Sequence, residues 1–191
     1  MINESYLESV KKQFLYYKTL CEKAIDQLEA NQLFVSPNED SNSIAIIIQH
    51  LAGNMLSRWT DFLTTDGEKE WRNRDEEFET LITTKEEVIE LWNKGWNCFF
   101  EAVNSLTPNQ LDTIIYIRNE GHTVLEAINR QLAHYPYHIG QIVFYAKILK
   151  DTSWNSLSIP KNDSKKYNLD KFSKEKSIKN FTDEELKKLK Q

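Results

Sequence analysis

Four long stretches of this chain repeat apolar residues at intervals of three and four, and this spacing limits the fold more than any other feature. Such spacing places the apolar side chains on one face of a helix. We therefore expect four amphipathic helices, whose apolar faces run from Leu7 to Leu28, from Ile44 to Phe62, from Val88 to Val103 and from Leu125 to Leu149.

Local signals mark where several of these helices start and end. Thr84 with Glu87, and Thr123 with Glu126, have the spacing of a capping box, in which each side chain satisfies an amide of the first helical turn. Proline residues at 37 and 108 break the apolar pattern between helices. The β-branched run at 114–117 could form a short strand or hairpin before the fourth helix.

Four helices with mostly modest connections predict an all-α, antiparallel four-helix bundle, a fold that can build a site in its core from facing helices. We assign the bundle to residues 1–155. Residues 156–191 form a charged tail with ten Lys and six Asp or Glu from residue 160 onward, and Thr182 could cap a final short helix there.

The connection at 64–83 is long for two neighbouring helices, and connections of that length are usually lids, binding loops or disordered segments. Its simplest interpretation is a solvated loop with Trp71 packed onto the helices. The alternative is that Arg72 or Arg74 meets an anionic group of a substrate.

The bulk properties exclude some classes of function. A net charge of −5 argues against general nucleic-acid binding, which normally requires a basic surface. The longest aliphatic run, at 44–48, is too short to span a membrane. The first residues lack the basic start and apolar stretch of a secretory signal, so we expect a cytoplasmic protein.

Three histidines are the strongest candidates for function. His134 and His138 lie four residues apart in the fourth predicted helix, so their side chains share a face, about 40° apart. His50 of the second helix could supply a third imidazole. Three imidazole ligands leave an open position on a metal ion such as zinc, nickel, copper or iron, which is typical of catalytic sites. The simpler alternative is that each histidine is only hydrogen-bonded or exposed.

The residue after His134 is Tyr135, whereas a metalloprotease would have a glutamate there to act as general base. That class is therefore disfavoured. Several polar residues lie within one or two helical turns of the histidines, or in the long loop, and could bind substrate or orient the imidazoles. They are Asn54, Arg58, Arg72, Arg74, Arg130 and Gln141.

Over residues 1–150 the chain resembles the DinB/YfiT-like superfamily of bacterial metal-binding bundles, and two segments that contain the histidines carry this resemblance. They are His50-Leu51-Ala52-Gly53-Asn54 and His134-Tyr135-Pro136-Tyr137-His138-Ile139-Gly140-Gln141. Further segments resemble one branch of it, classified as a domain of unknown function. These are Arg58-Trp59-Thr60-Asp61-Phe62, Asp66-Gly67-Glu68-Lys69, Trp71-Arg72-Asn73-Arg74-Asp75 and Leu157-Ser158-Ile159-Pro160.

The resemblance implies a divalent metal, zinc or nickel, held by His50, His134 and His138, with water in the remaining positions. It also implies a homodimer, and a relationship to S-transferases and isomerases that use low-molecular-weight thiols such as bacillithiol, mycothiol or glutathione. Our leading hypothesis is a metal-dependent thiol S-transferase that joins such a thiol to an electrophilic small molecule. The alternatives are a hydrolase that uses metal-bound water, and a non-catalytic metal-binding stress or structural protein.

Overall fold

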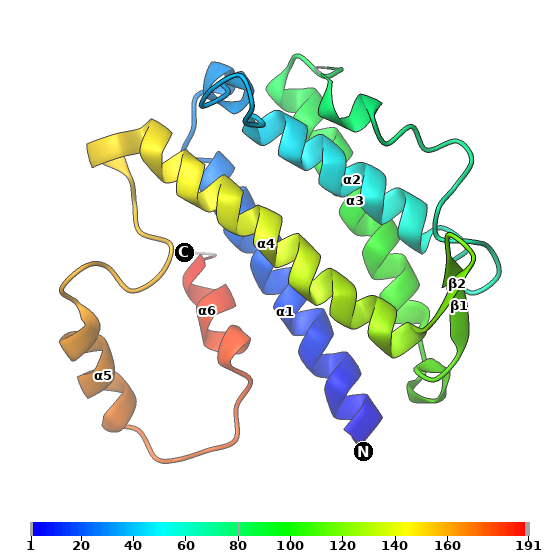
Figure 1. Ribbon diagram of the computed structural model, residues 1–191. Coiled ribbons are helices and arrows are strands. Elements are labelled where there is room, and N and C mark those ends of the chain that lie inside the picture. Colours follow the sequence, from blue (N-terminus) through cyan, green and yellow to red (C-terminus); the bar gives the residue numbers. More distant parts are fainter. Residues whose placement is uncertain (1, 80, 190–191) are drawn as a thin grey trace.

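The computed structural model describes residues 2–79 and 81–189, and the protein is mostly helical with one short hairpin (Figure 1). The long helices are α1 (Ile2–Ile25), α2 (Ile44–Trp59), α3 (Lys85–Ser105) and α4 (Val124–Lys150). The tail carries α5 (Ser164–Phe172) and α6 (Phe181–Leu189). Strands β1 (Ile114–Ile117) and β2 (Glu120–Thr123) form an antiparallel hairpin directly before α4. Single 3-10 turns connect these elements: η1 (Ala30–Phe34), η2 (Glu76–Phe78), η3 (Pro108–Gln110) and η4 (Asp151–Ser153).

The predicted capping boxes are confirmed at the starts of α3 and α4. Thr84 accepts a hydrogen bond from the Glu87 amide while the Glu87 side chain accepts from the Thr84 amide, and Thr123 and Glu126 do the same. At the start of α2, the Ser43 side chain accepts from the Ile46 amide. Because a capping box is local, the sequence alone was sufficient to locate the two at α3 and α4.

The long helices pack as two close pairs, α2 with α3 and α1 with α4 (Figure 1). Aromatic rings from three helices meet between the pairs. Phe14 of α1, Trp96 and Phe99 of α3, and Tyr135 of α4 are fully buried, with ring centroids 4.4 to 6.3 Å apart. Tyr135 of this cluster follows His134 directly in the sequence, so its packing fixes the part of α4 that carries the histidines.

Helix α2 is buried on nearly every side, with thirteen of its sixteen residues buried. Polar side chains on such a helix must be hydrogen-bonded, because an unpaired buried polar group is costly. The loop at 60–84 supplies the partners. Gln49 donates to the carbonyls of Glu76, Glu77 and Glu79, and Ser57 donates to the carbonyl of Gly67. The loop is therefore a fixed cover over one face of α2.

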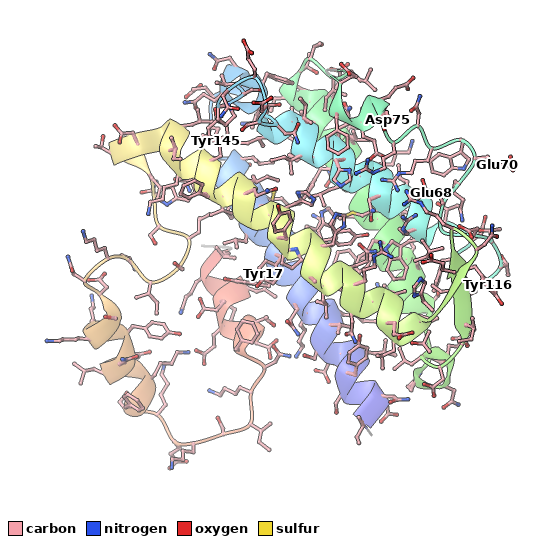
Figure 2. All side chains as sticks on the ribbon, viewed as in Figure 1. Tyr17, Glu68, Glu70, Asp75, Tyr116 and Tyr145 are labelled. Atoms are coloured by element: carbon pink, nitrogen blue, oxygen red, sulfur yellow. The ribbon has the colours of Figure 1, made fainter. Side chains whose placement is uncertain are left out.

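The same loop is also fastened to the hairpin. The hairpin turn consists of Arg118 and Asn119, with φ of 58° and 62°, and the carboxylate of Asp66 accepts from both of their amides at 2.8 Å. The Gly67 amide donates to the carbonyl of Tyr116. Figure 2 shows Glu68 and Tyr116 at this end of the molecule, where loop and hairpin meet. These bonds fix the position of Arg118.

Trp71 is 60% exposed, so the expectation that it packs onto the helices is wrong; the loop is held by Asp66, Gly67 and Glu77 instead. In the tail, α6 packs on α1 and buries Leu186 and Leu189. Among the described residues, no helix is both long enough and apolar enough to cross a membrane.

Candidate metal centre

Histidines 50, 134 and 138 meet in the space between α2 and α4. One ring nitrogen from each lies within 4.8 Å of the other two, and His50 Nε2 is 3.4 Å from His134 Nε2. The three ring centroids are 4.8 to 5.5 Å apart. The spacing of four residues therefore places His134 and His138 on one face of α4, as predicted, and α2 supplies the third imidazole.

The outer nitrogen of each imidazole is hydrogen-bonded to an oxygen atom. His50 Nδ1 donates to Glu77 Oε2 at 2.9 Å, His134 Nδ1 to Gln131 Oε1 at 3.3 Å, and His138 Nδ1 to Gln141 Oε1 at 2.8 Å. An oxygen acceptor keeps the proton on Nδ1, so the Nε2 atoms face the centre as lone pairs. Lone pairs facing one another repel, and a bound cation removes that repulsion. The residues present therefore fit a divalent metal ion.

Glu77, the partner of His50, is itself held by Arg72. Its carboxylate is buried and receives two hydrogen bonds from Arg72, with Nε to Oε1 at 2.7 Å and Nη2 to Oε2 at 2.9 Å. Burial alone would raise the pKa of Glu77, but the bonds from His50 and Arg72 lower it below its usual range. A charged carboxylate behind His50 makes that imidazole a stronger ligand.

A glycine on α2 makes room for this carboxylate. A Cβ atom at Gly53 would lie 2.2 Å from Glu77 Oε1, far inside van der Waals contact. Glycine is unfavourable in a helix interior by about 1 kcal/mol relative to alanine. Its presence at Gly53 is therefore explained by the position of Glu77.

The two histidines of α4 are kept neutral. Burial lowers the pKa of His134 to about 3, and the neighbouring His138 and His50 act in the same direction. Burial also lowers the pKa of His138. Neutral imidazole is the form that binds metals, so protons compete weakly with a cation at these two side chains near neutral pH.

A cavity of about 340 Å³ opens beside the centre. It is lined by His50, His134, Gln131 and Asn54, and by five arginines: Arg58, Arg72, Arg74, Arg118 and Arg130. Five of the predicted substrate-binding residues are thus brought together here, namely Asn54, Arg58, Arg72, Arg74 and Arg130. Gln141 does not line it; Gln141 holds His138 and borders another hollow with Phe144 and Tyr145.

Three residues of the site were missed by sequence reasoning. Gln131 could have been found, because it precedes His134 by three residues, one helical turn, as Gln141 follows His138 by three. Glu77 and Arg118 belong to the loop and the hairpin turn, where no periodic pattern indicates which way a side chain points.

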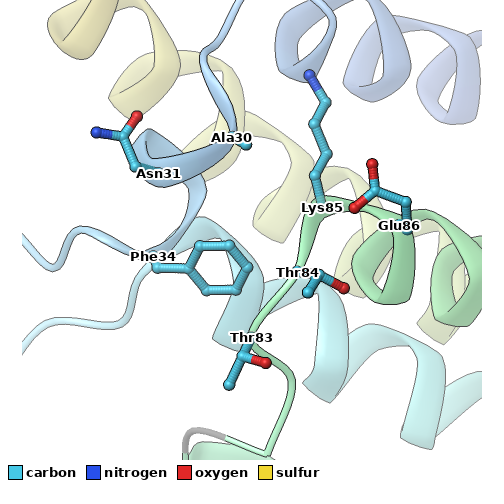
Figure 3. A pocket seen from close by; sticks show the side chains of 7 residues that line it. All are labelled: Ala30, Asn31, Phe34, Thr83, Thr84, Lys85 and Glu86. Carbon is cyan, nitrogen blue, oxygen red and sulfur yellow. The ribbon is translucent and has the colours of Figure 1, made fainter.

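A larger cavity, of about 570 Å³, lies between η1 and the start of α3 (Figure 3). Its lysine, Lys85, donates to the carbonyls of Ile25 and Leu28 at the end of α1. That lysine closes the end of a helix, so this cavity offers less chemistry than the smaller one at the histidines.

Fold and centre together define a mostly helical protein with a cluster of three histidines that could hold a metal ion. The model of a family described as protein of unknown function (DUF1572) matches residues 1–163, and the chain belongs to this family. The sequence prediction of a family of unknown function is thereby confirmed. No curated protein and no solved structure matches the chain.

Proposed function

We propose that this protein is a DinB/YfiT-like four-helix bundle that binds one divalent metal ion, zinc or nickel, through His50, His134 and His138, and that it is a metal-dependent thiol S-transferase. The observation that carries the proposal is the convergence of three imidazoles whose outer nitrogens are all held by oxygen acceptors. A structural cluster of histidines would not require all three tautomers to be fixed in this way.

A metal held by three imidazoles supplies a Lewis acid with an open position, which lowers the pKa of a thiol or a water molecule placed there. The protein's own residues supply orientation and access. Glu77, Gln131 and Gln141 hold the imidazoles, and the cavity beside His50 and His134 gives a small molecule a route to them.

The lining of the cavity favours a thiol over water as the nucleophile. Among the described residues, no carboxylate lines it, so no side chain there is suited to act as general base for water. A thiol has an ordinary pKa of about 8.5, far below that of water, so a thiol needs much less assistance to lose its proton. In the overall reaction the thiol proton passes to solvent, a sulfur–carbon bond forms, and the leaving group of the electrophile departs with its electron pair.

The first test is the metal content of untagged protein purified without chelators. We expect close to one metal ion per chain in the parent and a loss of metal in His134→Ala. The matched control is His122→Ala, because His122 is the one histidine of the chain outside the centre. Absence of metal in the parent after incubation with zinc and with nickel would refute the site.

The second test separates the three functions. Consumption of an electrophile that requires both metal and an added thiol supports the transferase, whereas turnover without thiol supports the hydrolase. A metal-loaded protein that turns over nothing, and whose melting temperature falls on chelation, would instead be a non-catalytic metal-binding protein. We include in the same proposal that the protein is a homodimer and is cytoplasmic. Light scattering of the metal-loaded protein tests the oligomeric state.

A further inference from the structure

All five arginines of this chain line one cavity. The sequence contains 24 Lys and Arg residues, of which five are Arg and nineteen are Lys. The cavity beside the metal centre is lined by Arg58 of α2, Arg72 and Arg74 of the loop, Arg118 of the hairpin turn and Arg130 of α4. No lysine from the described part of the chain lines it. Four separate segments therefore each contribute arginine side chains to the lining of this cavity.

Arginine and lysine differ in what they recognise. The guanidinium group is a planar fork of donors that matches a carboxylate or phosphate with two parallel hydrogen bonds, whereas the ammonium group of lysine is a point charge. Arginine without any lysine from the described residues gives this cavity the chemistry of anion recognition, and not merely a basic surface.

Two of the five arginines hold the cavity wall. The side chain of Arg58 is 6% exposed and that of Arg72 is 3% exposed. Arg58 donates to the carbonyl of Gly67 and pairs with Glu68 at 2.9 Å, while Arg72 holds Glu77. Arg72 uses all three of its side-chain nitrogens in bonds to Glu68 and Glu77, and Arg58 uses Nη1, so both arginines position the loop.

The other three arginines that line the cavity are more exposed. Arg118 is 57% exposed and shares Glu68 at 3.2 Å. Arg74 lies over the ring of Phe78, with its guanidinium carbon 5.3 Å from the ring centroid. Among the described residues, no carboxylate lies within 4 Å of Arg74 or Arg130, both of which are exposed. Five arginines against the carboxylates of Asp66, Glu68 and Glu77 leave a local charge of +2 in a chain whose net charge is −5.

We propose that this cavity binds a small molecule through its anionic groups, with two or three negative charges carried by carboxylate or phosphate and held by Arg74, Arg118 and Arg130. A volume of about 340 Å³ is at the lower end for small-molecule sites, which suits a compact ligand or the charged end of a larger one. His50 and His134 line the same cavity, so the rest of the ligand faces the histidines. This last step rests on the proposed function; the anion site itself does not.

The test is calorimetric titration of metal-free protein at physiological ionic strength with three probes: inorganic phosphate, succinate, and the uncharged succinamide. The variants are Arg74→Gln and Arg130→Gln, which break no ion pair among the described residues. The control is Lys147→Gln, which makes the same change of charge on the exposed surface of α4, outside the cavity. Metal content of each variant is measured separately.

We expect saturable binding of phosphate or succinate, no binding of succinamide, and a dissociation constant at least tenfold larger in both arginine variants but unchanged in Lys147→Gln. Binding of phosphate alone would identify a phosphorylated ligand, and binding of succinate alone a carboxylate ligand. Absence of binding, or equal binding by all variants, overturns the proposal. Because metal content is measured separately, a parent protein that binds metal but neither phosphate nor succinate contradicts the anion site and leaves the proposed metal centre unaffected.

Discussion

Replacing Gly53 by alanine tests the link between the loop and the metal centre. The new Cβ would lie 2.2 Å from Glu77 Oε1 and 2.7 Å from its carboxyl carbon, so the carboxylate must move. That movement weakens the bonds by which Glu77 holds His50 and is held by Arg72. A hydrogen bond to a charged group contributes about 1.5–3 kcal/mol.

The net effect on stability is smaller than that loss. Alanine gains about 1 kcal/mol over glycine in a helix interior. With one charged hydrogen bond lost, Gly53→Ala should be about 0.5–2 kcal/mol less stable than the parent. The matched control is Gly140→Ala in α4, where a new Cβ meets nothing within 4 Å. That variant should be about 1 kcal/mol more stable than the parent.

The more discriminating readout is metal affinity. Loss of an outer partner of a ligating histidine typically weakens metal binding by about 10–100-fold. Competition against a chromophoric chelator should show this loss in Gly53→Ala and no change in Gly140→Ala, while urea unfolding gives the two stabilities. Equal metal affinity in the two glycine variants would refute the argument that Glu77 supports the centre.

Three further outcomes follow from particular contacts. Gln141→Leu removes the acceptor of His138 Nδ1 and should weaken metal binding about tenfold or more by the same competition assay, with no loss of helix by circular dichroism. Asp66→Ala leaves the turn amides of Arg118 and Asn119 without their acceptor, so it should cost about 1–2 kcal/mol in urea unfolding; unchanged stability would contradict that role. Tyr135→Phe removes a hydroxyl that accepts from Trp59 Nε1 at 3.0 Å and donates to Asn54 at 3.2 Å, which should cost about 2 kcal/mol. Burial raises the pKa of Tyr135 in the folded protein, so above pH about 10 the unfolded chain loses the phenol proton first. The parent therefore loses stability as pH rises, and the difference in unfolding free energy between the parent and Tyr135→Phe should narrow.

The sequence predicted those parts of the structure that depend on local spacing. The starts of α3 and α4 follow from Thr84 and Thr123, because a capping box is complete within four residues. The pairing of His134 with His138 follows from helical geometry in the same way. His50 required one further assumption, that α2 and α4 face each other.

What escaped prediction depends on contacts between distant segments. Arg118 enters the cavity because the carboxylate of Asp66, 52 residues earlier, holds the hairpin turn. Glu77 reaches His50 because Gln49 binds the loop carbonyls and Gly53 leaves space for the carboxylate. The same limitation explains the error at Trp71: its exposure depends on how the loop is fastened, and nothing in the local sequence specifies that.

The contact between Glu77 and His50 also makes the loop a reporter of the centre. Glu77 belongs to a loop whose backbone carbonyls are bound by Gln49, so docking of the loop is coupled to orientation of the His50 imidazole for metal binding. Thermodynamic linkage requires two such events to strengthen each other by the same factor. If a metal ion binds at the histidines, we expect it to slow amide hydrogen exchange in η2, and protease cleavage in the loop should then measure what fraction of the protein carries metal.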